Sequence, residues 1–313
     1  MDLALNIGLI VLGIFLVLRG AERMTDGAVA LAQRMKIPQM VIGLTIVACG
    51  TSMPEFFVSL TSAIHGSADM AIGNVVGSNI FNTLLIVGVA AVVAPMIIAR
   101  STVRKDIPVA FMASILLGVM CLDGVISRID AAILFVCFLL FMAYTIRSAR
   151  KGEVEVSEEE QKDYGTGKSV FLIVYGLALL IVGSNIFVDA ATFVARTFGV
   201  SDAVIGLTIV ACGTSMPELA TSVVAAKNGQ SALAIGNVLG SNVFNILMVL
   251  GLTGIISPLQ INGITNIDLI LQFAAVALVW LFSYTKFKVE RWEGALLSLV
   301  FLTYLTWLVV NAL

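Results

Sequence analysis

The chain contains little charge, one histidine and no paired cysteine pattern, and these absences argue against several classes of protein. Only 12% of its 313 residues are charged, which is about half the fraction found in soluble domains. His65 is the single histidine, and none of the four cysteines, Cys49, Cys121, Cys137 and Cys212, has CxxC spacing. This composition argues against a soluble fold, a disulfide framework and a zinc site. No nucleophile has a plausible base, so we expect neither an enzyme nor a bound cofactor.

Apolar sequence is what the chain has in abundance. Hydrophobic residues make up 59% of it, in runs of about 20 residues that are long enough to cross the hydrocarbon core as helices. We therefore predict an all-α polytopic membrane protein that contacts the lipid bilayer and no nucleic acid. Ten transmembrane helices are expected, at residues 3–23, 38–63, 70–95, 105–121, 128–147, 169–190, 202–226, 231–256, 266–285 and 291–311.

Two strings of residues occur twice, and both are displaced by the same distance along the chain. VIGLTIVACGTSMPE occupies 41–55 and again 204–218 without a difference, and AIGNVVGSNIFN at 71–82 returns as AIGNVLGSNVFN at 234–245. Both displacements are 163 residues. The chain is therefore a duplication whose most similar parts are polar. A carboxylate inside each repeated apolar run indicates two halves of one ion site.

The duplication divides the chain into two membrane halves and a linker. We place the first five-helix repeat at 1–147 and the second at 169–313, joined by the charged stretch 148–168, whose composition is that of a solvated linker. Because each half has an odd number of spans, the second half must enter the membrane from the opposite side. The prediction is two inverted repeats, related by a pseudo-two-fold axis in the membrane plane.

The distribution of positive charge predicts the orientation. If the N-terminus lies outside, sixteen of the eighteen basic residues fall on the cytoplasmic side, and only Arg128 and Arg196 remain outside. Such a bias follows the positive-inside rule. We therefore expect a multi-pass protein of the cell membrane, with both termini extracellular and the 148–168 linker cytoplasmic.

Each copy of the first string predicts a broken helix at membrane depth. Pro54 has no N–H and its ring clashes with the carbonyl four residues back, while Gly50 loosens the preceding turn. The break is expected between these two residues, and between Gly213 and Pro217 in the second copy. Broken backbone at this depth is tolerated only where it lines a cavity or finds other partners. The freed carbonyls are hard oxygen ligands for cations.

Polar side chains are expected to converge on the same place. Residues seven, four and three positions before a glutamate share a helical face with it. In span two these are Ala48, Thr51, Ser52 and Glu55, and in span seven they are Ala211, Thr214, Ser215 and Glu218. Residues spaced by four form a polar stripe in each following span: Asn74, Ser78 and Asn82, and Asn237, Ser241 and Asn245. We assign Asn74, Asn79, Asn237 and Asn242 to capping or packing rather than ion contact.

Calcium is the ion that these donors suit. It takes roughly 6–8 oxygen ligands and favours carboxylates with carbonyls, and Glu55 and Glu218 together neutralise one divalent cation. Without a cation, two close carboxylates repel each other in a low-dielectric site. Some cation or proton must therefore replace calcium when it leaves, which suggests exchange.

At these residues the chain resembles the calcium/cation antiporter superfamily, in particular the prokaryotic sodium/calcium exchangers. The family's two α-repeats contain a G-T-S-x-P-E core followed by G-N-x-x-G-S-N, and both occur twice here. The resemblance implies that Glu55 and Glu218 bind calcium with the carbonyls of Thr51 and Thr214. It implies a sodium set made of these glutamates, Ser52, Ser78, Ser215, Ser241 and the carbonyls of Ala48 and Ala211. It also implies that spans one and six slide against the other eight.

One residue departs from the family pattern. Some relatives place an aspartate at the position of Asn245, whereas this chain has asparagine both there and at Asn82. An amide binds a cation through its oxygen, but it holds no transportable charge. The predicted site therefore has two acids, not three, with Asn82 and Asn245 lining it.

Three functions are compatible with this pattern. The first is a secondary antiporter that exchanges Na+ for Ca2+ by alternating access, and the second keeps the fold but couples calcium to protons. The third is a cation channel with a two-glutamate filter. The serines favour sodium over protons. The inverted repeat argues against the channel, since channels usually build their pores on an axis normal to the membrane.

Overall fold

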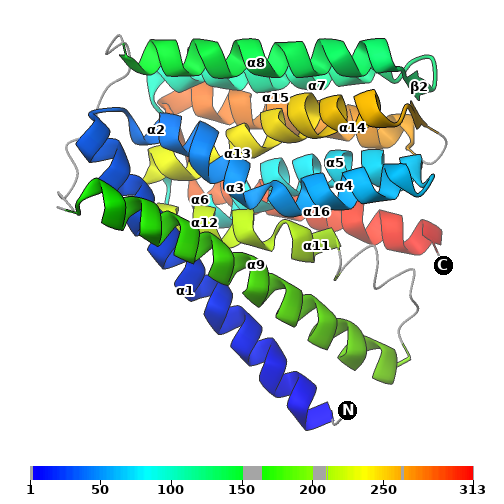
Figure 1. Ribbon diagram of the computed structural model, residues 1–313, viewed down its shortest axis with the longest axis horizontal. Coiled ribbons are helices and arrows are strands. Elements are labelled where there is room, and N and C mark those ends of the chain that lie inside the picture. Colours follow the sequence, from blue (N-terminus) through cyan, green and yellow to red (C-terminus); the bar gives the residue numbers. More distant parts are fainter. Residues whose placement is uncertain (1–2, 151–163, 200–208, 210, 262–263, 313) are drawn as a thin grey trace.

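The computed structural model describes residues 3–150, 164–199, 209, 211–261 and 264–312, and most of them are helical (Figure 1). The first half comprises α1 (Leu3–Met35), α2 (Gln39–Ile42), the π-helix η1 (Gly43–Val47), α3 (Ala48–Thr51), α4 (Met53–Ile64), α5 (Ala68–Ile80), η2 (Phe81–Ile86), α6 (Val87–Val93), β1 (Met96–Ile97), η3 (Thr102–Asp106), α7 (Ile107–Met120), β2 (Val125–Ile126) and α8 (Arg128–Arg150). The second half comprises α9 (Thr166–Thr197), α11 (Ala211–Thr214), α12 (Met216–Lys227), α13 (Ser231–Val243), η5 (Phe244–Val249), α14 (Leu250–Ile256), β3 (Leu259–Gln260), α15 (Asn266–Lys286), β4 (Lys288–Val289) and α16 (Arg291–Ala312).

The described helices confirm a polytopic membrane protein. Seven of them are long and apolar enough to cross a membrane, or up to eight if the bent pair Gln39–Thr51 and Met53–Ile64 is one span. The expected span 105–121 is not among them, because α7 has only 14 residues and a span needs about 20. Most of the linker, and residues 202–208 and 210 of the expected span seven, lie outside the described residues. The count of ten spans stays a prediction.

The bounds of the elements repeat along the chain at the spacing of the sequence repeat. α4, α5, η2 and α6 begin and end 163 residues before α12, α13, η5 and α14. The same displacement relates β1 to β3 and β2 to β4, yet the antiparallel pairs are β1 with β4 and β2 with β3. Each small sheet therefore takes one strand from each half, and these elements recur in the same order in both halves.

The helices that carry the repeated strings form the centre of the molecule. Within the apolar windows of Ala68–Val93 and Ser231–Ile256, 78% of residues are buried, against 22% for the helices beginning at Arg128 and Arg291. α13 packs closely on η1 and α2. Where α13 crosses η1, both helices have a glycine: a Cβ on Gly43 would lie 2.8 Å from the Leu233 carbonyl oxygen and close to Gly236. Spans two, three, seven and eight thus enclose the polar residues singled out in the sequence.

α1 and α9 lie side by side on one face, oblique to the other helices (Figure 1). They have 33 and 32 residues, which at about 1.5 Å per residue is about 50 Å, well beyond a hydrocarbon core of about 30 Å. Both helices therefore extend beyond the expected spans 3–23 and 169–190, and the limits of these spans within the membrane stay a prediction. Gly27 and buried alanines continue the packing face of α1 beyond residue 23 toward Met35.

Glycines set the close approach of α1 to α9. A Cβ on Gly13 would lie 2.8 Å from the Gly183 carbonyl oxygen, and one on Gly20 would lie 2.7 Å from that of Gly176. Such contacts let two backbones meet with no side chain between them. The higher-numbered glycine of α1 meets the lower-numbered one of α9, so these repeat-related helices run antiparallel.

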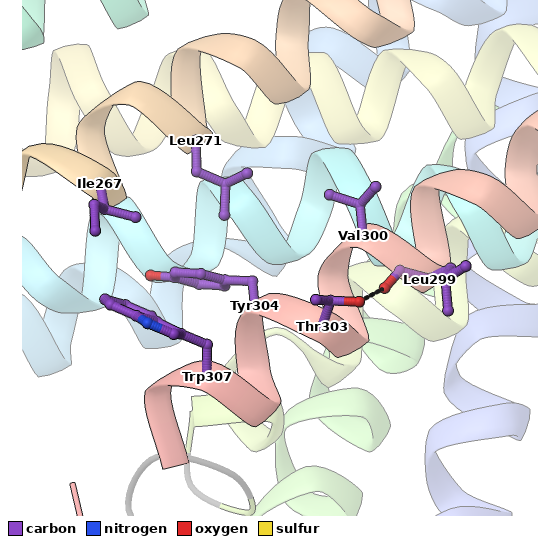
Figure 2. Close-up of a pocket in the computed structure, with 7 residues that line it drawn as sticks. All are labelled: Ile267, Leu271, Leu299, Val300, Thr303, Tyr304 and Trp307. Carbon is purple, nitrogen blue, oxygen red and sulfur yellow. Dashed lines mark hydrogen bonds between the residues drawn. The ribbon is translucent and has the colours of Figure 1, made fainter. Parts of the chain in front are cut away.

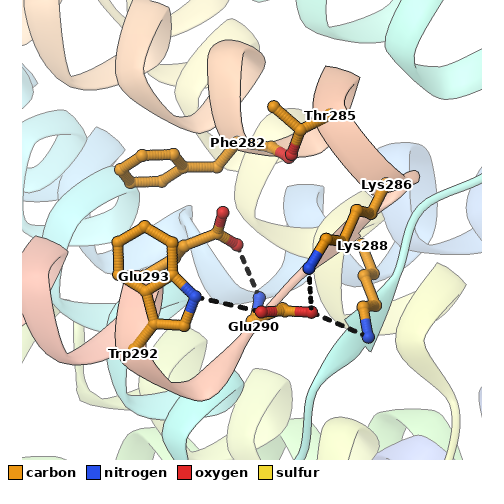
Figure 3. A network of polar contacts seen from close by, with 7 residues as sticks. All are labelled: Phe282, Thr285, Lys286, Lys288, Glu290, Trp292 and Glu293. Atoms are coloured by element: carbon orange, nitrogen blue, oxygen red, sulfur yellow. Dashed lines mark hydrogen bonds and ion pairs between the residues drawn. The ribbon is translucent and has the colours of Figure 1, made fainter.

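Charged side chains fix the turn between α15 and α16 (Figure 3). The Glu290 carboxylate accepts hydrogen bonds from the ammonium groups of Lys288 (2.9 Å) and Lys286 (3.1 Å) and from Trp292 Nε1 (3.0 Å). The hydrogen bond from Lys288, followed in size by the one from Lys286, lowers the pKa of Glu290 to about 2. The Glu290 N–H donates to the Glu293 carboxylate at 2.7 Å. This network holds β4 in place, and β4 is the strand that pairs with β1.

Candidate cation-binding site

Each repeated glutamate lies in the first turn of a helix that follows a break. Ser52 leaves helical geometry (φ −84°, ψ 6°) between α3 and α4, and the two parts of this span are bent by 46°. Ser215 has nearly the same angles (φ −88°, ψ 8°) between α11 and α12. Pro54 and Pro217 fall in the first turn after each break, where the missing N–H removes no helical hydrogen bond. The predicted breaks are confirmed. In each of them, the serine is the one residue that leaves helical geometry.

The two copies of the string hold each other's glutamates. Ser52 Oγ donates to Glu218 Oε1 at 2.9 Å, and Ser215 Oγ donates to Glu55 Oε1 at 3.0 Å. Ser215 Oγ also lies 3.2 Å from Ser78 Oγ. All of these side chains are buried, and both glutamates have an exposed fraction of 0%. The structure therefore brings together serines and carboxylates that are 166 and 160 residues apart in the sequence.

Several oxygens at this centre have no hydrogen-bond partner. They are Oε2 of Glu55 and of Glu218, Oδ1 of Asn82 and of Asn245, and Oγ of Ser241, all buried. A buried acceptor without a donor is costly, and carboxylate and amide oxygens are ligands that hard cations prefer. Each repeat contributes one carboxylate and one amide oxygen. The donor set fits a cation as cargo.

A network of asparagines orients the two amides that line the site. Asn82 Nδ2 donates to Asn242 Oδ1 (3.2 Å), and Asn245 Nδ2 donates to Asn79 Oδ1 (3.1 Å). Asn79 Nδ2 in turn donates to the Asn242 carbonyl (3.2 Å), and Asn242 Nδ2 donates to Thr83 Oγ1 (2.6 Å). The nitrogens of Asn82 and Asn245 are thereby engaged, so the partnerless atom of each amide is its oxygen. Asn79 and Asn242 hold these nitrogens, and their assignment to capping or packing rather than ion contact stays a prediction.

The first asparagine of each polar stripe binds backbone instead. Asn74 Nδ2 donates to the Glu55 carbonyl (3.1 Å) and to Ser59 Oγ (2.9 Å). Its repeat mate does the same: Asn237 Nδ2 donates to the Glu218 carbonyl (3.3 Å) and to Ser222 Oγ (2.9 Å). Sequence reasoning missed both serines, although each follows its glutamate by four residues. These bonds fix the helix that carries each glutamate, which supports the capping role predicted for the two asparagines.

Comparison with known proteins decides the family. The family model described as "Sodium/calcium exchanger protein" matches residues 5–147 and 168–310. A putative antiporter of Alkalimonas amylolytica is 38% identical over 94% of this chain and 96% of its own, and the sodium/calcium exchanger MaX1 of Methanosarcina acetivorans is 30% identical over 97% and 98%. A solved structure of the sodium-calcium exchanger NCX_Mj, soaked with zero Na+ and Ca2+, superposes with a TM-score of 0.87 at 30% identity, over 98% of this chain and 100% of that one.

The chain belongs to the sodium/calcium exchanger family. Members of this family are membrane transporters rather than enzymes, and no cofactor is indicated for them. The antiporter resemblance drawn from the two repeated strings is confirmed.

The remaining residues expected at the exchanger site flank the two breaks. Ala48 and Thr51 begin and end α3, and Ala211 and Thr214 begin and end α11. Thr51 is fully buried and its hydroxyl donates to Asn237 Oδ1 at 3.2 Å, while Thr214 is half-buried. In the described part of the chain, no group of three or more His, Cys, Asp and Glu side chains is placed to hold a metal. The site therefore rests on two acids and neutral oxygens.

A groove on the side of the exchanger is separate from this site (Figure 2). It has a volume of about 480 Å³ and is lined by Ile267, Leu271, Leu299, Val300, Thr303, Tyr304 and Trp307. Its polar atoms have partners, since Thr303 Oγ1 donates to the Leu299 carbonyl (2.9 Å) and the Tyr304 hydroxyl to Asp268 Oδ1 (2.6 Å). This apolar groove offers a cation no ligands.

Proposed function

We propose that the protein is a secondary antiporter that exchanges Na+ for Ca2+ by alternating access at the central two-glutamate site. The observation that supports this most directly is the set of buried oxygens without partners, one carboxylate and one amide oxygen from each repeat. Two carboxylates balance the charge of one calcium ion. The broken backbone before each of them adds carbonyl oxygens toward the roughly 6–8 ligands that calcium takes.

The ligands divide by ion in this proposal. Calcium is held by Glu55 and Glu218, with the carbonyls of Thr51 and Thr214. Sodium uses these glutamates with neutral oxygens: Ser52, Ser78, Ser215 and Ser241, the carbonyls of Ala48 and Ala211, and the lining amides of Asn82 and Asn245. The hydroxyls of Ser52 and Ser215 already touch the carboxylates, so both ions would engage the same acids. Sharing of ligands is what makes the ions exclude each other.

Radiolabelled calcium uptake into proteoliposomes loaded with sodium, potassium or protons tests this function. Uptake driven by an outward sodium gradient, and not by the other two, is the expected result. Uptake driven by a proton gradient alone would show that the coupling ion is the proton and not sodium, on the same fold. Flux far above the turnover of a carrier, or single-channel currents, would favour a channel.

The membrane arrangement that we propose is ten spans in two inverted repeats, 1–147 and 169–313, joined by a cytoplasmic linker at 148–168. The antiparallel packing of α1 on α9 and the exchange of strands between halves support it. The basic residues place both termini outside. The C-terminal ends of α12 and α15, which carry Lys227 and Lys286, then face the cytoplasm.

Cysteine labelling in intact cells checks this orientation. Cysteines introduced at Glu155 and Glu160 should not react with a membrane-impermeant maleimide added outside, because the charged linker is expected to be cytoplasmic. A cysteine in place of Asp123, in the exposed turn after α7, is the matched positive control. The native cysteines are first replaced by alanine. Labelling of the linker from outside, with Asp123→Cys protected, would reverse the proposed orientation.

Asn242→Ala should weaken calcium binding about tenfold, the scale reported for outer-shell partners of metal ligands. Asn242 accepts the amide hydrogen of Asn82 at 3.2 Å, so its loss frees that amide to turn a donor toward the cation. Calcium titration of purified protein measures the effect, with Asn228→Ala at the exposed end of α12 as the control. Unchanged affinity in Asn242→Ala would show that the network does not orient the site.

A further inference from the structure

The small sheet made by β1 and β4 has an outer face that combines apolar and cationic side chains. Strand pairing sets Ile97 opposite Lys288 and Met96 opposite Val289. Directly opposite residues of an antiparallel pair lie on the same face. Met96 and Val289 are buried, whereas Ile97 is 71% exposed, so Lys288 shares the outer face with Ile97.

Two ammonium groups meet beside this face. Lys286 Nζ and Lys288 Nζ both donate to the same carboxylate atom, Glu290 Oε1, at 3.1 and 2.9 Å (Figure 3). One carboxylate balances the charge of only one of them. Each ammonium has three N–H donors, and the side chains of Lys286 and Lys288 are 62% and 40% exposed. Donors that Glu290 does not use therefore remain for a second anion.

The ring of Phe287 holds a third cation at the same place. The Arg100 guanidinium lies 4.9 Å from the centroid of this ring, and the N–H of Ile98, two residues before Arg100, donates to the Phe287 carbonyl at 2.8 Å. Arg100 is exposed and forms no ion pair with any residue that the structure describes. A cation–π contact uses none of the five N–H donors of a guanidinium, so Arg100 also has donors for an anion.

The backbone at Phe287 is left-handed, which is unfavourable for an aromatic residue. Its φ is 53° and its ψ is 35°. The repeat mate at the displacement of 163 residues is Gly124, with a φ of 79°, and glycine adopts this conformation readily. Both halves thus need a left-handed residue in this turn, but only one half has a ring there. Strained residues of this kind cluster at functional positions, and here the strained residue supports Arg100.

The cations are not needed to build the turn, because the first half builds an equivalent turn without them. The Glu290 N–H donates to the Glu293 carboxylate at 2.7 Å, and the repeat mates form the same bond, from the Ser127 N–H to the Asp130 carboxylate at 3.0 Å. At the positions of the two lysines, the first half has an aspartate and a valine. The basic group is therefore present on one side of the molecule only.

This basic group lies where two membrane helices end. Lys286 is the last residue of α15 and Arg291 the first of α16, and both helices are long and apolar enough to cross a membrane. In the adjoining turns, Tyr284 is 64% exposed and Trp292 is 59% exposed. Exposed tyrosine and tryptophan at helix ends mark the level of the lipid headgroups. The anion that a membrane presents at this level is a lipid phosphate.

We propose that Arg100, Lys286 and Lys288 bind the phosphate of an anionic phospholipid, with its acyl chains beside Trp292. Basic groups at a membrane surface attract anionic lipids, and here three cations face the single exposed-turn carboxylate of Glu290. In the orientation proposed above, this lipid belongs to the cytoplasmic leaflet. The lipid site goes beyond the proposed antiport and does not depend on which ion is exchanged.

Native mass spectrometry of the purified full chain in detergent tests the site. Phosphatidylglycerol is the probe, and phosphatidylcholine with the same acyl chains is the comparison, since its choline offsets the phosphate charge. Arg100→Gln and Lys288→Gln should each weaken phosphatidylglycerol binding about fivefold, the scale for one basic residue at an anionic surface, and should not change phosphatidylcholine binding. Lys227→Gln removes the same charge from the exposed end of α12 and should have no effect.

Phe287→Gly separates lipid binding from the structure of the turn. Glycine suits the left-handed backbone, so the variant should fold, as gel filtration checks, but it should bind phosphatidylglycerol about threefold more weakly because Arg100 loses its ring. Lys288→Arg keeps the charge and should keep the affinity. Equal binding of the two lipids would overturn the site, and so would unchanged phosphatidylglycerol affinity in Arg100→Gln or Lys288→Gln. Displacement of the lipid by millimolar inorganic phosphate would overturn the lipid assignment in favour of a soluble anion.

Discussion

Glu55→Gln and Glu218→Gln will each reduce calcium exchange by at least about a hundredfold and leave the protein folded. Each glutamate supplies one of the two formal charges that balance a calcium ion in a fully buried site. Removal of one charge at about 4 Å costs several kcal/mol even at an effective dielectric constant near 20, and about 2.7 kcal/mol already corresponds to a hundredfold loss of affinity. The substitution also turns Oε2, an acceptor without a partner, into a donor that repels the cation.

Folding should survive because the serine contacts survive. Ser215 Oγ donates to Glu55 Oε1 at 3.0 Å, and the amide oxygen of a glutamine accepts the same hydrogen bond. Calcium uptake in proteoliposomes measures the loss, and gel filtration in detergent checks the fold. Glu22→Gln, at an exposed position of α1, is the control and should transport normally. Exchange near the rate of the unmodified protein in either site variant would reject the two-carboxylate site.

Because the chain is a duplication, the two helix breaks at the centre of the site could be predicted from the sequence. A proline and a glycine bracket each break, and this local chemistry specifies where the backbone is interrupted. The structure narrows the interruption to Ser52 and Ser215, and Met53 after the break is helical. A proline near the start of a helix costs no hydrogen bond, so the helix resumes one residue before Pro54 rather than after it.

Contacts between the halves could not be predicted from spacing. Nothing local to Ser52 specifies that it bonds Glu218 rather than Glu55, three residues away. That choice depends on how the two halves pack. The same holds for η2 and η5, the π-helical turns that contain Asn82 and Asn245. The expected polar stripe, with a spacing of four residues, assumes a regular α-helix. In the wider π-helical turns, the amide of Asn82 bonds Asn242 and the amide of Asn245 bonds Asn79.

Differences between the repeats carry as much information as their identity. Thr83 accepts from Asn242, but its repeat mate is Ile246, so the asparagine network has a polar end on one side only. Ser184 donates to the Gly213 carbonyl at the second break, while its mate Ala21 has no hydroxyl for Gly50. Sequence comparison reveals these unequal pairs. Their consequences appear only when the neighbouring helices are in place.

Sodium will weaken calcium binding, and calcium will weaken sodium binding by the same factor. Both ions are proposed to use Glu55 and Glu218, and two formal charges cannot hold calcium with a full sodium complement without excess positive charge in a low dielectric. Linkage then requires that the effect be reciprocal. Calcium binding to the purified protein across a sodium titration measures it, with ionic strength held constant by a large organic cation.

The serines should separate the two ions. Ser52 and Ser215 each donate to a glutamate of the other repeat, at 2.9 and 3.0 Å. Ser52→Ala or Ser215→Ala removes a neutral ligand from the proposed sodium set but leaves both carboxylates for calcium. The sodium needed to halve calcium binding should rise about tenfold, as expected for about 1.4 kcal/mol, while calcium affinity without sodium changes little. Ser114→Ala controls for loss of a buried hydroxyl, because Ser114 bonds its own helix at Ala110. An apparent calcium affinity that stays flat through the titration would reject the shared site and the assignment of sodium as the exchanged ion.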